Sequence, residues 1–382
     1  MKQFILLAFL SISLFANNSE LLTQTKQEII ELKKEQIKQK EKTNKYDWVG
    51  DINLNGTVSI NQDDIKSEDY SISLSQDIFK FGGIYSQVKY AKELKKLEEL
   101  NLNITTKEDI KLLYTYVIDI RLDEISIKQN ILNIKNSQID IEHKKSEYKA
   151  GELGISDLND AIITKNNLRT TQKSLLLSKQ QNINSLKMYT EKQYSAIKMP
   201  NMKLIEKDTF LENAIALKSA TLSVNVNNLS YDIKKSSYLP SLSFDTKLGY
   251  ANSDNTIGED YYSYGLKVFV PLSFISSSDI QQSKLDYLIS KKEYAKKLNT
   301  IELNYDEIIL QIQSNKEKIE LAFEDIQLYD ELLGVNEEEY KAGYKTIDDI
   351  NSLKNSMQIR KLDIKSYKIN IQKELLKLYF MI

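Results

Sequence analysis

The stretch Glu147-Tyr148-Lys149-Ala150-Gly151 recurs as Glu339-Tyr340-Lys341-Ala342-Gly343, and this duplication decides how the rest of the chain is interpreted. An Ile and an Asp follow each copy before a helical pattern resumes. A chance match of five residues is improbable, so the chain is predicted to be an internal two-fold repeat. Each copy ends in Gly, which readily adopts the left-handed conformation just past a helix C-terminus. The duplicated stretch therefore predicts one helix end in each half.

A very long helix is predicted to lead into each copy. Residues 85–150 contain neither Pro nor Gly, and their apolar positions recur in alternating steps of three and four. The same seam runs through residues 294–333, where Asn315 interrupts it. A helix of about 65 residues would be about 100 Å long, so it must pack along others of similar length. After each Gly, a return helix is expected, with Ser156 and Asp157, or Thr346 and Asp348, as caps.

Before each long helix, the sequence alternates with the period of a β-strand. Apolar residues occupy the even positions and small or polar residues the odd positions of two predicted hairpins, 47–79 and 240–273. Each strand runs about eleven residues, which is the length of a tilted strand that crosses a bilayer. Aromatic rings near the strand ends are expected at the membrane interface, with core packing as the alternative, namely Trp48, Tyr250, Tyr261 and Tyr262. A soluble sandwich with one wet face would show the same alternation.

The first residues predict export from the cytoplasm. Lys2 precedes an apolar run from Phe4 to Phe15, and the small residue Ala16 follows, as in a cleaved signal peptide spanning 1–16. An N-terminal membrane anchor is the alternative, although about twelve apolar residues are few for a span. The absence of Cys fits an oxidising compartment and leaves no thiol for lipid attachment.

Composition argues against several classes of function. The 382 residues include 54 acidic and 52 basic side chains, so no basic face indicates a nucleic-acid partner. His143 is the only His, which excludes a His-based metal site or triad within one chain. No Gly-rich phosphate loop, nucleophile elbow or acid/base cluster is evident. We therefore expect no enzyme activity, no catalytic residues, no metal and no cofactor.

The strand count predicts an assembly of several chains. Four strands are too few to close a barrel, and an open strand edge cannot lie in lipid because its amides would lack partners. In a closed barrel, the small odd-position residues would line a polar lumen, while the apolar even positions would face outer membrane lipid. The long helices would continue this barrel as a tube. A tube joined to a pore is a conduit.

The motifs together resemble the TolC-type outer membrane efflux proteins. The resemblance rests on the two Tyr-Lys-Ala-Gly turns, on 238–242 (Tyr-Leu-Pro-Ser-Leu) opening a strand, and on 74–83 (Leu-Ser-Gln-Asp-Ile-Phe-Lys-Phe-Gly-Gly) closing one. It covers the chain from about Tyr46 to the C-terminus. It implies a mixed α and β fold in which three protomers form a 12-stranded outer membrane β-barrel, four strands per chain, continued by a long α-helical coiled-coil periplasmic barrel.

The resemblance also implies the partners and the function. The chain would be a homotrimer that docks on a periplasmic adaptor (membrane fusion) protein and an inner membrane pump of RND, ABC or MFS type. It would serve as the passive exit duct of a tripartite efflux or type I secretion system. The alternative is a trimeric coiled-coil surface or adhesin-like protein without transport activity. A stalk needs one set of strands at one end, whereas this chain enters its predicted barrel twice.

The predicted division of the chain follows from the repeat. A short N-terminal helical segment, 17–46, precedes repeat 1, which spans 47–190 with its long helix at 82–150 and its return helix at 157–189. A connector with equatorial helices spans 191–238. Repeat 2 spans 239–382, with helices at 278–342 and 349–380. The resemblance leads us to expect a longer first helix than 17–46 provides, and a gap in the tunnel wall or in the equatorial region as the consequence.

The turns carry the candidate site residues. The surface that meets the adaptor is expected to comprise Gly151, Leu153, Gly154, Gly343, Tyr344 and Lys345. By resemblance, acidic residues just beyond the second turn narrow the periplasmic entrance, and Asp349 with its neighbour Asp348 occupies that place. Three copies around an axis would attract cations. An ordinary helix cap is the alternative, as it is for Asp157 and Asp160 after the first turn.

Overall fold

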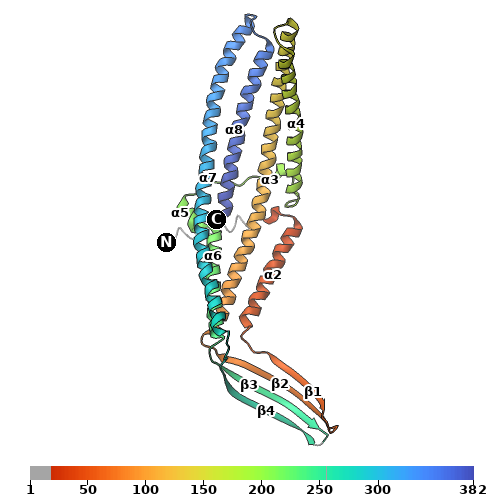
Figure 1. The fold of residues 1–382 in the computed structure, drawn as a ribbon, viewed down its shortest axis with the longest axis vertical. Helices are drawn as coiled ribbons and strands as arrows, with labels where there is room; N and C mark the ends of the chain where they lie inside the picture. The colour runs from red at the N-terminus through yellow and green to blue at the C-terminus, as the bar shows by residue number, and fades with distance from the viewer. Residues whose placement is uncertain (1–18, 255) are drawn as a thin grey trace. The chain divides into compact units, whose positions relative to one another are not determined.

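The structure is a computed structural model that describes residues 19–254 and 256–382. The predicted signal peptide, 1–16, lies outside the described residues. The elements follow one another twice in the same order, a helix, a hairpin, a long helix and a return helix (Figure 1). Their bounds are η1 Ser19–Leu21, α2 Gln24–Tyr46, β1 Ile52–Ile60, β2 Lys66–Phe79, α3 Gly83–Ala150, α4 Ile155–Leu186, η2 Tyr194–Ala196, α5 Lys207–Asn213, α6 Ile215–Ser236, β3 Ser241–Ser253, β4 Thr256–Phe269, α7 Ser276–Lys341 and α8 Ile347–Met381.

The four strands form one antiparallel sheet in the order β1-β2-β3-β4. The two hairpins, far apart in sequence, join because β2 pairs with β3, from Ser67 opposite Ser253 to Phe79 opposite Leu242. An irregularity between Asp77 and Phe79 shifts this register near the end of β2. Since β1 and β4 each have one strand neighbour, the sheet of a single chain has two unpaired edges.

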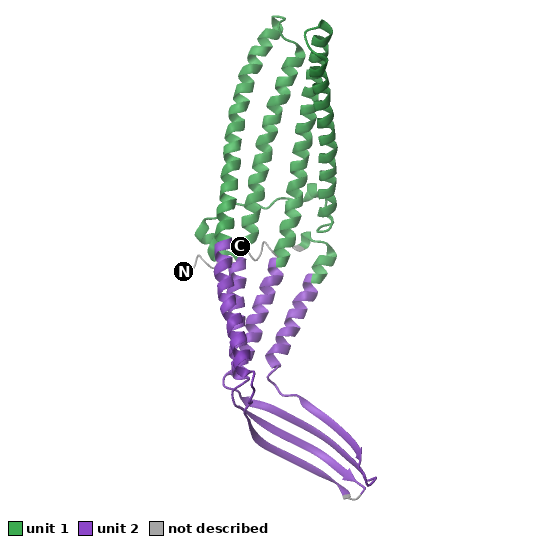
Figure 2. Ribbon diagram, in the orientation of Figure 1, with its two compact units in different colours: residues 1–29, 105–214, 301–382 green, residues 30–104, 215–300 purple. Residues whose placement is uncertain are grey.

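The chain divides into two compact units (Figure 2). Unit 1 comprises residues 1–29, 105–214 and 301–382, and unit 2 comprises residues 30–104 and 215–300. Unit 2 holds the sheet and the helical segments next to it in sequence. Unit 1 holds the duplicated turns and the helices on either side of them.

The heptad seams form the core of unit 1. Leu113, Val117 and Ile120 are fully buried on α3, and Ile308 and Ile312 are buried on α7. The polar interruption Asn315 is buried too, but its Nδ2 donates to the carbonyl oxygen of Gln311 at 2.7 Å. The helix itself thus satisfies this side chain, and the apolar seam continues past it.

The connector is fixed to α7 within unit 1. Phe210 of α5 is fully buried, and its ring centroid lies 5.1 Å from that of Tyr305. The Tyr305 hydroxyl donates to the carbonyl oxygen of Ile205 at 2.8 Å, and Lys207 lies 2.9 Å from Asp306. Burial raises the pKa of Tyr305, so the phenol is neutral and remains a donor.

The first helix, α2, is about as long as α6, the helix in the same place in the second repeat. α2 has 23 residues and α6, the helix before the second hairpin, has 22. Ion pairs connect α2 to α3 in each unit: Lys26 to Asp109 at 2.8 Å in unit 1, and Glu41 to Lys95 at 2.7 Å in unit 2. α2 is thus about as long as α6, and the expectation that it is shorter than the first helix of TolC-type proteins stays a prediction.

Candidate functional site

The register of the sheet separates one apolar face from one polar face. Residues directly opposite each other lie on the same face. One row across the four strands joins Leu54, Ile72, Leu248 and Tyr262, and the adjacent row joins Asn55, Ser71, Gly249 and Tyr261. On the apolar face, Leu54 is 80% exposed and Tyr262 is 73% exposed. A contiguous apolar surface of this kind is suited to contact with lipid or protein, not water.

Tyr261 lies on the polar face, contrary to its predicted place with the interfacial aromatic residues. Its ring crosses β3 over Gly249, where a Cβ atom would lie 2.4 Å from the ring. The hydroxyl donates to the carboxylate of Asp69, on β2, at 2.7 Å. Lys247 adds its ammonium 5.1 Å from the ring centroid and 3.9 Å from the carboxylate. A glycine at 249 thus allows a hydrogen bond to span three strands.

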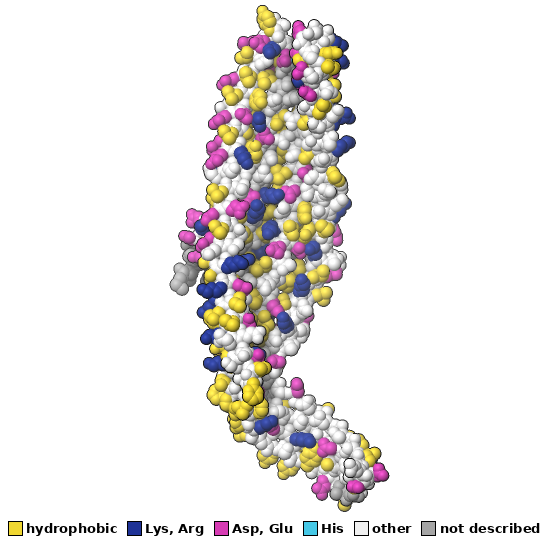
Figure 3. Space-filling view, viewed as in Figure 1, with side chains coloured by type: hydrophobic (Ala, Val, Ile, Leu, Met, Phe, Trp, Pro, Cys, Tyr) yellow, Lys and Arg dark blue, Asp and Glu magenta, His cyan; other side chains and the backbone are white. Residues whose placement is uncertain are grey.

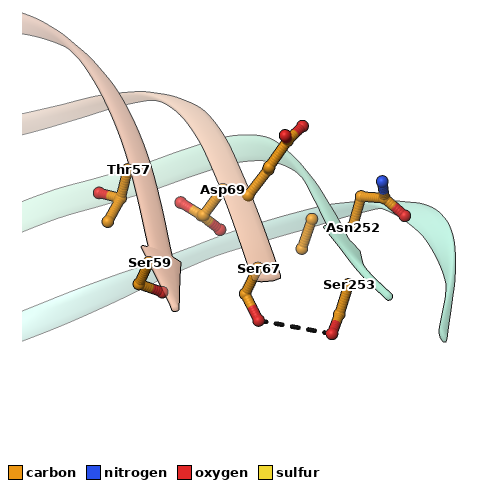
Figure 4. A pocket seen from close by; sticks show the side chains of 8 residues that line it. Thr57, Ser59, Ser67, Asp69, Asn252 and Ser253 are labelled. Carbon is orange, nitrogen blue, oxygen red and sulfur yellow. Dashed lines mark hydrogen bonds between the residues drawn. The ribbon is translucent and has the colours of Figure 1, made fainter. Parts of the chain in front are cut away.

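The sequence analysis does not predict the Asp69 cluster, which comprises Asp69, Lys247 and Tyr261, although the positions of these residues in the sequence indicate it. All three residues occupy odd positions, the parity of the polar face. Beside Asp69, the hairpin ends form an open polar hollow, in which the Ser67 and Ser253 hydroxyls lie 3.4 Å apart (Figure 4). The hollow has no metal-binding arrangement, since no group of three or more His, Asp or Glu suited to an ion occurs in residues 19–254 and 256–382.

Both duplicated turns have the same geometry. Gly151 has φ +77° and Gly343 has φ +84°. In each turn, the Gly amide donates to the carbonyl of a Tyr three residues back, and the next amide donates to a Glu carbonyl five residues back. This pair of bonds satisfies the last carbonyls of the helix, as in a Schellman motif. The prediction that Gly ends each long helix is confirmed.

The return helices begin differently in the two repeats. At the second turn, Thr346 caps α8, and its Oγ1 accepts from the Asp349 amide at 3.2 Å. The Asp349 carboxylate in turn accepts from the Thr346 amide at 2.8 Å, which completes a capping box. At the first turn, Gly154 is the cap residue and makes no side-chain cap bond. Capping by Ser156 or Asp157 is therefore wrong for α4.

Asp349 is held as an anion by these bonds. The hydrogen bond from the Thr346 backbone amide is the main cause that lowers the pKa of Asp349, against an opposing effect of burial. His143 Nε2 on α3 lies 4.0 Å from its other carboxylate oxygen. Asp348, by contrast, is exposed. Asp349 thus completes the capping box that Thr346 begins, whereas Asp348, predicted to cap α8 with Thr346, presents its side chain to solvent.

The remaining predicted docking residues cluster at the turns of unit 1. Leu153 is half-buried, and Lys345 is exposed. Tyr344 is 84% exposed, which is high for an aromatic side chain. Figure 3 shows acidic and basic side chains interspersed over the helices, with apolar side chains between them. Among the described helices, none is both long and apolar enough to cross a bilayer.

Residues 208–381 match the family model described as "Outer membrane efflux protein". No curated protein matches the chain in sequence. Solved structures match its fold along nearly the whole length. A membrane protein from Pseudomonas aeruginosa has a TM-score of 0.74 at 12% identity, over 96% of this chain and 88% of that one. The Campylobacter jejuni CmeC outer membrane channel has a TM-score of 0.70 at 14% identity, over 94% and 84%.

A third solved structure has the same fold. The Neisseria gonorrhoeae MtrE outer membrane channel, in its open state, has a TM-score of 0.70 at 13% identity and covers 95% of this chain and 86% of that one. At such identities the likeness concerns the fold. The predicted mixed fold, in which a four-stranded sheet joins long helices, is confirmed, as is the resemblance to TolC-type proteins.

The Asp69 cluster predicts a position-specific effect of glycine replacement. Gly249→Val would drive the Tyr261 ring from β3 and break its bond to Asp69, so we expect a clearly lower thermal midpoint, equivalent to about 1–3 kcal/mol. Gly265→Val is the matched control, because open space surrounds that glycine on the same face. Scanning calorimetry of the two variants makes the comparison. Equal midpoints would show that the ring does not depend on Gly249.

The capping box predicts a defined pH dependence. Because the folded-state pKa of Asp349 is lowered, its stabilising effect is complete above the unfolded pKa of about 4 and is lost as pH falls through the folded value. Asp349→Asn should therefore lower the thermal midpoint above about pH 5, by an amount equivalent to about 1 kcal/mol, and the difference should shrink below about pH 4. Asp348→Asn, at an exposed neighbour, should give a small difference. Identical pH profiles for the two variants would contradict this role.

Proposed function

Since residues 208–381 match the family model of outer membrane efflux proteins and nearly the whole chain has the fold of outer membrane channels, we propose that the protein is the exit duct of a tripartite efflux or type I secretion system. The duct is passive, and substrate moves through it without chemical change. The protein resides in the outer membrane after cleavage of its signal peptide, with its helices in the periplasm.

The observation that carries this proposal is the two-faced sheet with two unpaired edges. In hydrocarbon, the unpaired amides and carbonyls of β1 and β4 would each cost several kcal/mol. Pairing β4 of one copy with β1 of the next removes both edges. A homotrimer then forms a 12-stranded barrel, with the apolar face toward lipid and the Asp69 cluster in the lumen. The helices of three copies form the tunnel.

The partners follow from the same premise. A periplasmic adaptor connects the tunnel to an inner membrane pump of RND, ABC or MFS type. The exposed residues around the two turns, above all Tyr344 and Lys345, form the adaptor-docking surface together with Gly151, Leu153, Gly154 and Gly343. An adhesin-like stalk would need only one set of strands. In this chain both repeats contribute strands to one sheet, because β2 pairs with β3, and this favours the duct.

The entrance is controlled by an acidic ring. Asp348 and Asp349 of three copies converge at the periplasmic mouth, where their negative potential concentrates cations. Asp349 can contribute to this ring while it remains in the capping box of α8, because the capping bonds use only one of its two carboxylate oxygens. Asp348 is exposed and adds charge beside it.

Planar-bilayer recording tests both the channel and its entrance. The purified protein should form cation-selective channels that multivalent cations block. Replacing Asp348 and Asp349 together with Ala should reduce selectivity and block while trimers persist. The pair Asp157→Ala and Asp160→Ala, after the first turn, serves as the control. If the protein shows no conductance, the proposal that it is a duct is wrong. If the double variant keeps its selectivity, the acidic ring is wrong, and the role of Asp349 is limited to the capping box.

Adaptor docking is tested at the left-handed glycines. A Val at Gly151 and Gly343 is strained at positive φ, so the turns should distort and cross-linking of the adaptor to a photoreactive group at Tyr344 should fall at least several-fold. Gly334→Val is the control, because Gly334 lies within α7 in open space. The docking assignment fails if adaptor cross-linking and export persist when both turn glycines are replaced.

A further inference from the structure

Three helical segments of unit 1 carry a local excess of positive charge. They are residues 125–139 of α3, 161–186 of α4 and 350–373 of α8. These segments contain two, four and six Lys or Arg residues, respectively, and a single acidic residue, Asp363. The whole chain, by contrast, has a formal net charge of -2. The positive charge is therefore concentrated on these three helices.

Most of these basic side chains are exposed and have no acidic partner. Five of them bond to other side chains of unit 1, namely Lys165, Lys179, Lys354, Arg360 and Lys373. The others are exposed and make no ion pair with another side chain in residues 19–254 and 256–382. On α8 these are Lys361, Lys365 and Lys368. On α3 they are Lys128 and Lys135, and on α4 they are Arg169 and Lys173. We call them the basic belt.

Two hydrogen bonds align the three helices at the level of the belt. Gln129 of α3 donates to the Asp363 carboxylate of α8 at 2.7 Å. The next residue of α3, Asn130, donates to the Leu168 carbonyl oxygen of α4 at 2.9 Å. Successive residues of α3 thus bond to the two helices beside it, which lie on either side of α3 (Figure 1).

The belt crosses these helices at that level. Lys128 on α3, Arg169 on α4, and Lys361 and Lys365 on α8 each lie within two residues of a residue that makes one of these bonds. A helix rises about 1.5 Å per residue, so their backbones lie within about 3 Å of the bonds along the helix axes. The cations therefore form a band across three helices.

The belt lies on the side of α3 that contacts the connector. Lys128 and Lys135 continue a row that begins with Arg121 and Glu124, at steps of three, four and seven residues. Arg121 donates to the Ile197 carbonyl oxygen, and Glu124 accepts from the Tyr194 hydroxyl, so this row faces the connector. A connector inside the proposed tunnel would obstruct it. We therefore assign this side to the outside of the tunnel.

The chemistry of the belt fits a flexible polyanion better than a folded protein. Protein interfaces are commonly centred on aromatic side chains, whereas the only aromatic residue of the three segments is Tyr367, which is half-buried. Six of the seven belt residues are Lys, a mobile point charge that needs no fixed geometry in its partner. Each such contact is weak, but several contacts to one polymer act together.

We infer that the basic belt binds peptidoglycan through the carboxylates of its peptide stems. The inference rests on the proposed function only in that the helices lie in the periplasm. A tube that extends from the outer membrane toward the inner membrane passes through the peptidoglycan layer. That layer lies across the tube, as the belt does, and its carboxylates complement the Lys side chains in charge.

Co-sedimentation with purified peptidoglycan sacculi tests the belt. The full-length protein in detergent should pellet with the sacculi at low salt and stay in solution at high salt, because salt screens pairs of exposed charges. Sacculi with amidated carboxylates should retain several-fold less protein. This comparison uses the wild-type protein, so it does not depend on the folding of a variant.

A charge-removing variant locates the binding surface. Lys361→Gln, Lys365→Gln and Lys368→Gln together should reduce pelleting with native sacculi several-fold, and these side chains are exposed, so the helix packing is retained. The control is the triple variant Lys284→Gln, Lys292→Gln and Lys296→Gln, which removes three exposed charges of α7 in unit 2. Since both variants change the net charge equally, the control should pellet like the wild-type protein.

The outcomes separate the belt from the proposed function. Equal pelleting with native and amidated sacculi, or an equal loss in both triple variants, overturns the inference. A belt variant that pellets normally but loses adaptor cross-linking from Tyr344 also overturns it, because the belt would then serve the adaptor. Planar-bilayer recording runs in parallel. A wild-type protein that forms no channel, yet pellets with native sacculi through the belt, contradicts the duct and supports the belt.

Discussion

The unsatisfied backbone of β1 and β4 is the constraint on which the rest of the structure depends. Four strands with the alternation of a membrane barrel leave two edges, and lipid offers no hydrogen-bond partner to either. A soluble sheet could leave an edge to water or protect it with charge. The apolar face of this sheet is largely exposed, so both the face and the two edges need to be covered. In the proposed duct, neighbouring copies pair with the edges, and lipid covers the apolar face.

The helices impose a second constraint that agrees with the first. α3 has 68 residues and α7 has 66, and helices of this length are stable only when their apolar seams are covered along the whole length. The chain covers the α3 seam with α4 and α8. It leaves apolar positions of α7 and α4 exposed, so the helical part is incomplete in one copy just as the sheet is. Both features agree with the closed ring of copies that is proposed for the duct.

Much of this architecture could be predicted from the sequence, because the signals are strong and local. The repeat of Tyr-Lys-Ala-Gly places two helix ends, and both turns have the left-handed Gly that this requires. The alternation in the hairpins indicates which side chains share a face. The predicted fold class is correct because the spacing of apolar residues and the positions of turn-forming Gly residues are local properties of the sequence.

The details that could not be predicted depend on contacts between distant residues. Tyr261 follows the polar parity, but aromatic residues near strand ends are commonly interfacial, and the decisive partner, Asp69, is two strands away. The sequence predicts capping of α4 by Ser156 and Asp157 because such residues favour helix starts, whereas Gly154, with an extended backbone and no side chain, occupies the cap position. The comparison of α2 with α6 required the bounds of both helices.

Amide hydrogen exchange of the protein in lipid nanodiscs is the most direct measurement of whether the strand edges are closed. In a closed barrel, the amides of β1 and β4 that point away from β2 and β3 have partners on the neighbouring copy. Their exchange should then be as slow as that of the amides between β2 and β3. Fast exchange confined to the outer edges of β1 and β4 would show that the sheet remains open and would contradict the assembly of copies into a barrel.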